Sequence, residues 1–177
     1  MTITKPDDFK KLLPNIPEER YKNIWFFPVR QDRKNPDVPS ETILKGNTAY
    51  RLTVRDCLTR LKAGKNIGIY ALTGGLMFLD IDVQDGKLKA SKEFMKQIPD
   101  TFTVKSRNGG YQFYYLNEGN YPNQIIKEND IEVGELRTDW YYVVGVGSYV
   151  NPDENNADGN GIYHIEKNIS VTSFHSL

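Results

Sequence analysis

From residue 66 onward, the chain consists largely of short apolar segments separated by turn residues. Tyr, Phe, Val and Ile recur in these segments, and such residues favour β-strands. A strand-rich chain must bury at least one face of a sheet, which limits the architectures open to it. We predict strands at 23–30, 66–72, 76–83, 101–106, 111–116, 131–136 and 141–150, and a late short strand at 162–166.

Three segments have helical character. Residues 5–20 predict a short helix broken by Pro14 and Pro17, and residues 87–98 predict a helix that ends before Pro99. Residues 52–65 predict a helix with Thr53 as its N-cap and Gly64 at its end. The order of elements predicts an α+β fold in which helices pack on one face of a mostly antiparallel sheet. Hairpins are expected at RNGG, between 101–106 and 111–116, and at RTDW, between 131–136 and 141–150.

Charge and cysteine content exclude several classes of protein. The 23 basic and 23 acidic residues balance, so any site for a polyanion must be a local patch. The single cysteine, Cys57, excludes a disulfide framework and a cysteine-rich zinc site. No apolar run is long enough to span a membrane and no signal peptide is evident, so we expect a soluble cytoplasmic protein without membrane partners.

Two acids end the apolar segment LMFLDIDV. Side chains alternate along a strand, so Asp80 and Asp82 share one face while Leu79 and Ile81 share the other. A solvated strand end would also fit this short and common pattern. If the site is partly buried, a divalent cation would relieve the repulsion, and ligands that are all oxygen suit Mg²⁺ or Mn²⁺.

Two further elements could complete such a site. Glu135 in VGELRTDW is a candidate third carboxylate, with Arg137 on the same strand face, although a surface ion pair would explain the two equally well. In KSRNGGYQF, Gly109 and Gly110 allow the backbone to approach an anion. Taken alone, RNGG is more typical of a simple hairpin turn.

Other chemistries have little support. His164 and His175 are the two histidines of the chain, and both lie near its C-terminus, so a Ser-His-Asp triad or histidine-ligated metal is not indicated. No P-loop or dinucleotide fingerprint is present. Residues 156–167 imitate part of an EF-hand loop but lack both anchoring acids, so we interpret them as a hairpin loop.

Three segments occur in the order and spacing of one known family. They are IGIYALTGGLMFLDID, VKSRNGGYQFYY and GELRTDWYYVVGVGSYVN. On these segments, residues 23–151 resemble the primase–polymerase (prim-pol) catalytic domain of the archaeo-eukaryotic primase superfamily, found in archaeal plasmid and phage replication proteins. The resemblance implies an N-terminal α/β module packed beside an RRM-like, mostly antiparallel sheet that carries the metal carboxylates.

The resemblance also implies roles for individual residues. It assigns catalysis and the binding of two Mg²⁺ or Mn²⁺ ions to Asp80, Asp82 and Glu135. The candidate nucleotide-binding residues are Lys105, Ser106, Arg107, Gly110, Gln112, Arg137 and Ser148. The segment RKNP resembles an upstream basic element of the family, and Lys34 and Lys45 are our candidates for contacts to nucleic acid.

The sequence departs from the family pattern at three places. Gln112 stands where the family usually has a phosphate-contacting His, and Gln keeps a donor but cannot carry a positive charge. Glu135 stands where Asp is more frequent. Residues 151–164 replace a Cys/His zinc stem that some plasmid relatives have, so no zinc is implied. The first departure points to reduced activity.

The expected function is therefore DNA-templated nucleotidyl transfer from dNTPs or NTPs to a primer terminus or initiating nucleotide. The setting would be replication of a plasmid, virus or other mobile element, with a helicase or template-binding domain outside this chain as a partner. Two alternatives stay open, a binding module for nucleotide or single strands with weakened catalysis, and a metal-dependent nuclease. We expect one catalytic domain over 1–177, divided into 1–70, 71–151 and a C-terminal loop and strand at 152–177.

Overall fold

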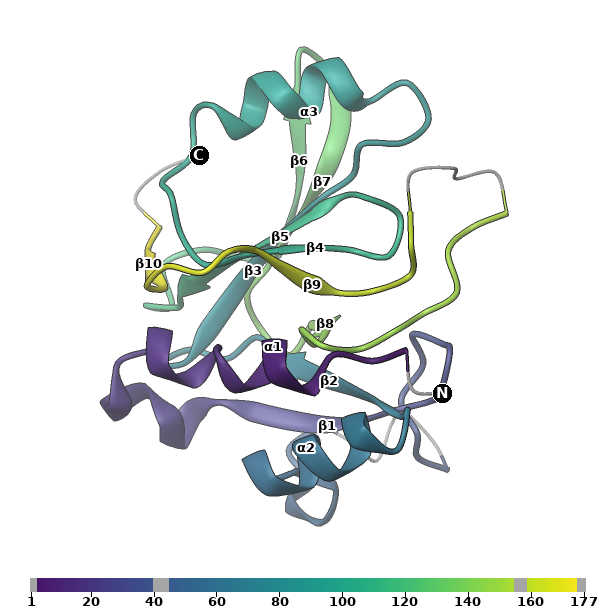
Figure 1. Ribbon diagram of the computed structural model, residues 1–177. Helices are drawn as coiled ribbons and strands as arrows, with labels where there is room; N and C mark the ends of the chain where they lie inside the picture. Colours follow the sequence, from purple (N-terminus) through teal and green to yellow (C-terminus); the bar gives the residue numbers. More distant parts are fainter. Residues whose placement is uncertain (1–2, 40–44, 155–158, 175–177) are drawn as a thin grey trace.

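The structure, a computed structural model, describes residues 3–39, 45–154 and 159–174 and contains two β-sheets (Figure 1). The smaller sheet is antiparallel in the order β1–β2–β8. Its strands are β1 (Trp25–Val29), β2 (Asn66–Tyr70) and β8 (Tyr142–Val144). Helices α1 (Pro6–Lys10) and α2 (Val54–Lys62) belong to this half of the molecule.

The larger sheet has seven strands in the described part of the chain, in the order β6–β7–β3–β5–β4–β9, with β10 paired to β5. Every pairing is antiparallel except that of β10 with β5. The strands are β3 (Leu76–Ile81), β4 (Thr103–Lys105), β5 (Tyr111–Leu116), β6 (Gln124–Glu128), β7 (Ile131–Arg137), β9 (His164–Lys167) and β10 (Thr172–Ser173). Helix α3 (Leu88–Met95) packs on one face. The predicted α+β class with mostly antiparallel strands is confirmed.

The helix signals in the sequence have physical counterparts. Thr53 caps α2, and a capping box joins its hydroxyl and backbone to Asp56. Cys57 and Leu61 are buried on the inner face of α2, and Gly64 follows with a φ of 78°. The first predicted helix is broken as expected: after α1 the chain continues as 3₁₀ turns at Leu13–Asn15 and Glu18–Asn23.

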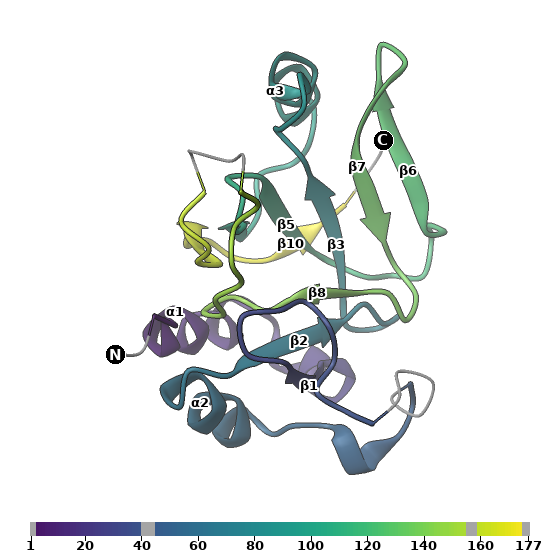
Figure 2. The same ribbon diagram turned by 90° about the vertical axis from the view of Figure 1, so that its right-hand side faces the viewer.

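The core consists of three apolar clusters, of which the first joins the two halves. The first lies between the sheets and α1 and α2, the second between the large sheet and α3, and the third on the far face of the small sheet. Along β3, Phe78 belongs to the first cluster, whereas Leu79 and Ile81 belong to the second. Asp80 therefore lies on the face of β3 that belongs to the first cluster, toward the small sheet. Figure 2 shows the three strands of the small sheet below β3.

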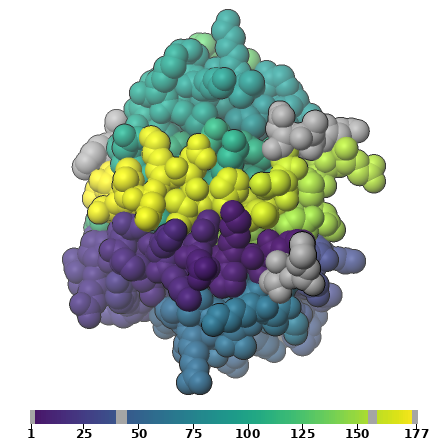
Figure 3. All heavy atoms as spheres, in the orientation of Figure 1, coloured from purple at the N-terminus to yellow at the C-terminus, as the bar shows by residue number. Residues whose placement is uncertain are grey.

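The C-terminal strands tie the layers together from one side. In Figure 3, the C-terminal residues up to 174 lie between the N-terminal residues and the α3 half of the molecule. Two backbone groups make the connection. The Ile165 N–H donates to the Asp8 carboxylate at 2.9 Å, and the Val171 N–H donates to the Asn15 carbonyl at 2.8 Å.

Among the described residues, no helix is both long and apolar enough to cross a membrane.

One sequence prediction of strand pairing is wrong. Residues 131–136 do not pair with 141–150; β7 pairs with β3 and with β6, a strand that we did not predict. Asn129 and Asp130 both adopt positive φ, and such residues form the tight turn that joins β6 to β7. After β7 the chain crosses to the small sheet, where β8 pairs with β2. The division into modules at residue 70 stays a prediction. The small sheet nevertheless combines β1 and β2, from the predicted module 1–70, with β8, from the predicted module 71–151.

Candidate nucleotide and metal site

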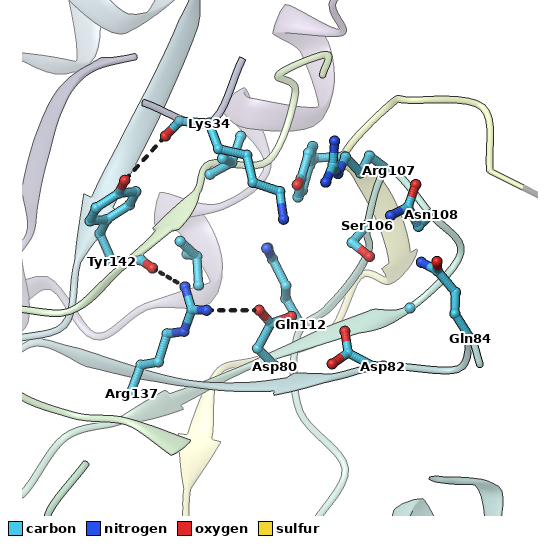
Figure 4. A pocket seen from close by; sticks show the side chains of 14 residues that line it. Lys34, Asp80, Asp82, Gln84, Ser106, Arg107, Asn108, Gln112, Arg137 and Tyr142 are labelled. Carbon is cyan, nitrogen blue, oxygen red and sulfur yellow. Dashed lines mark hydrogen bonds and ion pairs between the residues drawn. The ribbon is translucent and has the colours of Figure 1, made fainter. Parts of the chain in front are cut away.

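A polar pocket of about 230 Å³ opens between the two sheets and holds both strand-end acids. Figure 4 shows Asp80, Asp82 and Gln112 rising from the large sheet, with Lys34 entering from the loop after β1. The lining residues are Lys34, Asp80, Asp82, Gln84, Ser106, Arg107, Asn108, Gly110, Gln112, Arg137, Tyr142, Val143, Val144 and Tyr163. Charged and amide groups dominate this set, which suits a polyanion with its counter-cations better than an apolar ligand.

The two aspartates differ in exposure. The Asp80 side chain is 24% exposed and that of Asp82 is 59% exposed. Burial raises the pKa of Asp80 above its usual range, more than the Arg137 guanidinium lowers it, and the charge of Asp82 adds to the rise. Burial also raises the pKa of Asp82, and the Lys87 ammonium 4.0 Å away partly offsets this. The pair thus carries an unfavourable concentration of negative charge that a bound cation would relieve.

The strand register builds a row of side chains across the large sheet. Asp80 is opposite Gln112 on β5 and opposite Glu135 on β7, and Glu135 is opposite Ile125 on β6. Directly paired residues point to the same face, so the row runs from Gln112 through Asp80 and Glu135 to Ile125. The next pairs place Arg137 beside Phe78 on that face. The sequence predicted the acids, but the row depends on a pairing that was not predicted.

Arg137 lies between the acids of adjacent strands. Its Nη2 is 3.5 Å from Asp80 Oδ2 and 3.2 Å from Glu135 Oε2, and its Nε also donates to Glu135 Oε2 at 3.2 Å. Its Nη1 donates to the Tyr142 carbonyl at 2.5 Å, and the Tyr142 hydroxyl donates to the Lys34 carbonyl at 3.2 Å (Figure 4). These contacts connect the acid row to β8 and to the loop that carries Lys34.

The expected cage of three carboxylates is not assembled. Among the described residues, no three His, Cys, Asp or Glu side chains form a group that could hold a metal ion. Glu135 lines a second pocket beside Ile125 and Tyr141, and Arg137 lines both pockets. Asp80 and Asp82 nevertheless fit a divalent cation, since they offer oxygen ligands in a polar pocket, and Glu135 lies on the same face in the adjacent register position.

The glycine turn is both a hairpin and a wall of the pocket. Ser106 and Gly110 close the turn through a backbone hydrogen bond of 2.9 Å, and Gly109 has a φ of 84°. A Cβ on Gly110 would lie 2.5 Å from the Ile81 carbonyl oxygen, so glycine permits the turn to approach β3. The two interpretations of RNGG are therefore compatible, and the turn brings Ser106 beside the acids.

The turn is held in place by the loop after β8. Arg107 Nη2 is 3.3 Å from Asp153 Oδ1, and its Nη1 donates to the Asn151 carbonyl at 2.8 Å. The Asn108 amide donates to Asp153 Oδ2 at 2.7 Å, and the Asp153 N–H donates back to Asn108 Oδ1 at 3.0 Å. Arg107 Nε is buried without a hydrogen-bond partner. Asp153 thus orients the Arg107 guanidinium at the pocket. Asp153 belongs to a loop for which the sequence predicted only polar character.

Gln112 forms part of the pocket floor and is 3% exposed. Its Oε1 is buried and has no hydrogen-bond partner. Leaving a buried polar atom unpaired costs about 1–3 kcal/mol, so a ligand that supplies a partner would bind with that gain. An unpaired side-chain oxygen at the back of a polar pocket is the kind of group that a bound ligand or its water shell would satisfy.

Besides Glu135, three predicted site residues lie outside this pocket. Lys105 has its Nζ 5.7 Å from the centroid of the Tyr111 ring and lines a small pocket with His164. Lys45 has its Nζ 5.5 Å from the centroid of the Trp140 ring. Ser148 is fully buried, and its hydroxyl bonds to the backbone N–H and carbonyl of Ile67, so it holds the small sheet together.

Lys34 was predicted to contact the template, but its side chain lines the pocket that holds the two aspartates. Its pKa is lowered by burial of its ammonium end and then by Arg107. Sequence reasoning missed six lining residues, which are Gln84, Asn108, Tyr142, Val143, Val144 and Tyr163. Asn108 belongs to the RNGG turn and Gln84 to the segment after Asp82, whereas the others come from segments that no local pattern links to the acids. The tyrosines in particular reach the pocket only through the pairing of β8 and the C-terminal segment.

The fold and site define a class of α+β domain in which a carboxylate pair and several cations share one pocket between two sheets. Residues 19–169 match the family described as Bifunctional DNA primase/polymerase, N-terminal (Prim-Pol), and the chain belongs to this family. A search of curated proteins found no match. Membership points to primase and polymerase activity in DNA replication, with DNA and nucleotides as substrates and divalent metals in general use.

Proposed function

We propose that this domain transfers nucleotidyl groups from (d)NTPs to a primer terminus or initiating nucleotide on a DNA template, in replication of a plasmid, virus or other mobile element. The observation that carries the proposal is the pocket itself. In this pocket the Asp80 and Asp82 carboxylates lie with N–H and O–H groups from other elements, those of Lys34, Ser106 and Arg107. Triphosphates need both kinds of group, since their oxygens bind cations and N–H or O–H donors.

Each side chain has a distinct task in this proposal. Lys34 and Arg107 neutralise the triphosphate, and the Ser106 hydroxyl and Gln112 amide donate to its oxygens. Asp80 and Asp82 would hold Mg²⁺ or Mn²⁺, with Glu135 as a further ligand. When bound, such ions lower the pKa of an attacking hydroxyl and neutralise charge on the leaving pyrophosphate. Asp153 keeps the Arg107 guanidinium in position through its ion pair.

The second pocket suggests where the acceptor strand approaches. It begins at Glu135 and Arg137 and includes Ile125 and Tyr141, each of which is 55% exposed. An exposed aromatic ring beside the acids can stack on a base. We place the nucleotide that carries the attacking hydroxyl here, on the side of Arg137 away from the triphosphate donors.

Two alternatives use the same groups. A binding module would hold nucleotide or single strands without turnover, and the replacement of His by Gln112 favours it. A nuclease would use the carboxylates to hydrolyse a phosphodiester. Primer-extension and cleavage assays on one labelled primed template, with Mg²⁺ or Mn²⁺, separate the three. We expect extension that requires dNTPs; cleavage without dNTPs would favour the nuclease, and binding without either reaction would favour the binding module.

Because Lys34 lines the acid pocket and Lys105 lines a different one, we exchange the roles expected for them from the sequence, and this gives a prediction. Lys34→Ala should raise the nucleotide KM by about tenfold, because it removes from the pocket a charged group that donates hydrogen bonds to phosphate. Lys105→Ala should leave that KM unchanged and lower the salt slope of template binding by about 0.7, if Lys105 contacts a single strand. Steady-state kinetics and template Kd at several salt concentrations measure both effects. A raised nucleotide KM for Lys105→Ala alone would restore the sequence assignment.

Gln112 provides a second prediction. Gln112→His should lower the nucleotide KM by about fivefold at pH values below about 6.5, where an unperturbed imidazole is charged and forms a stronger hydrogen bond to phosphate. The gain should fade as the pH rises. Nucleotide KM measured from pH 5.5 to 8 for both proteins tests this. Identical KM values over the whole range would mean that residue 112 does not contact the triphosphate.

A further inference from the structure

We propose that Arg137 is an internal counter-cation that holds Glu135 away from the Asp80–Asp82 pair, so that a divalent metal must displace it. This inference rests on the proposed metal-dependent function and adds a competition within the site. Without a metal, Arg137 supplies the positive charge that the acids require. With a metal, Glu135 is released and becomes available as the third carboxylate.

The geometry of Glu135 is the first support. Its backbone is directly opposite Asp80, and residues paired in this way have Cβ atoms about 4.5–5.5 Å apart. A carboxylate on the Glu side chain can therefore reach toward the Asp80 carboxylate. It instead receives Nε and Nη2 of Arg137, both at 3.2 Å, and lines the neighbouring pocket. The strand register places Glu135 on the same face as Asp80. The ion pair with Arg137 therefore accounts for the turn of the Glu135 side chain away from Asp80.

The position of Arg137 is the second support. Its Nη2 contacts carboxylates on both strands and stands between the two pockets. The Arg137 side chain is 28% exposed, so water only partly screens its ion pairs with the two carboxylates. A doubly charged cation offers the same carboxylates a stronger interaction, so metal and guanidinium compete for Asp80 and Glu135. Competing ligands for one set of groups weaken each other's apparent affinity.

A release path for Arg137 is also present. Its Nη1 already donates to the Tyr142 carbonyl, so the guanidinium keeps one partner when it leaves the acids. Tyr142 in turn bonds to the Lys34 carbonyl. Movement of Arg137 would therefore be transmitted to the backbone of the loop that brings Lys34 to the triphosphate. Binding of the metal would in this way affect the binding of the nucleotide through Arg137, Tyr142 and Lys34.

Manganese binding, followed by the free Mn²⁺ signal in electron paramagnetic resonance, tests this without turnover. Arg137→Met should tighten Mn²⁺ binding by about fivefold or more, the lower end of typical coupling between two sites. Lys34→Met is the matched control, because it removes a cation of the same pocket for which the structure gives no ion pair with Glu135; it should tighten binding less. In a Glu135→Gln background, Arg137→Met should have a clearly smaller effect.

The outcomes separate this inference from the proposed function. If Asp80→Asn/Asp82→Asn abolishes Mn²⁺ binding but Arg137→Met leaves the affinity unchanged or weaker, the competition is wrong and the metal site stands. Equal tightening by Arg137→Met and Lys34→Met would also overturn it, because the effect would then be general electrostatics. If the double Asp variant binds Mn²⁺ as the wild type does, the metal site itself is wrong. Arg137→Lys, which keeps the charge without the fork, should tighten binding partially and replaces Arg137→Met if that variant does not fold.

Discussion

Asp80→Asn together with Asp82→Asn should lower nucleotidyl transfer by about a thousandfold or more, beyond the roughly 10–100-fold loss typical of removing a group outside the metal's own ligands. The reason is that both carboxylates line the pocket that also holds Lys34, Ser106 and Arg107, the groups that we propose bind the triphosphate. Primer extension with labelled dNTPs measures the effect. Activity within a few-fold of the wild type would exclude these acids from catalysis.

The same variant should keep or gain thermal stability without metal. Burial raises the pKa of both acids, so the folded state binds their protons more tightly than the unfolded state does. A raised pKa of an acid means that its ionisation costs stability, and this cost grows as the pH rises through the raised pKa. Replacing the acids by Asn removes that cost at neutral pH. A lower melting temperature at pH 7, measured by circular dichroism, would contradict this account of the site's charge.

Gly134→Ala should have the largest effect on stability of any change near the site. A Cβ at this position would lie 1.9 Å from the Asp80 carbonyl oxygen, within the β3–β7 ladder, where the backbone has little room to move. Overpacking of this kind costs up to about 3 kcal/mol, which for a domain of this size lowers Tm by up to roughly 6–12 °C. The shift of β3 should also lower activity at temperatures where the variant is still folded.

A matched glycine tests the reason for this effect. Gly46 has a positive φ, and an added Cβ there would meet nothing within 4 Å. Gly46→Ala should therefore cost only the backbone strain, about 1 kcal/mol, and leave activity intact. Thermal unfolding of the two variants, with extension assays at 20 °C, compares them. Equal losses of stability in both would mean that the close contact with Asp80 is not what makes Gly134 necessary.

The sequence predicted the parts of this molecule that local rules determine. Alternation along LMFLDIDV placed Asp80 and Asp82 on one face and Leu79 and Ile81 on the other, because the pleat of a strand fixes this direction. The α2 cap was equally readable, since Thr53 and Asp56 bond to each other within one turn. The glycine hairpin followed from its turn residues. In each case the determining contacts lie within a few positions of the chain.

Contacts between distant segments were not readable in this way. The strand β6 has the polar ends of QIIKE and was missed, so Ile125 and the second pocket were missed with it. The destination of β8 depends on pairing with β2, more than 70 residues earlier, as its Gly68↔Val144 register shows. The positions of Lys34 and Lys105 depend on contacts between distant segments in the same way. Strand direction at β4 turns Lys105 to the face with Tyr111, whereas the loop after β1 brings Lys34 to Asp80.

The position of bound Mn²⁺ can be located by anomalous diffraction from a crystal of the domain with a non-hydrolysable deoxynucleoside triphosphate. We expect a manganese peak between Asp80 and Asp82, the triphosphate along Ser106, Arg107 and Lys34, and Glu135 released from Arg137. A peak at another site, or a nucleotide bound away from the pocket that holds Asp80, would contradict it.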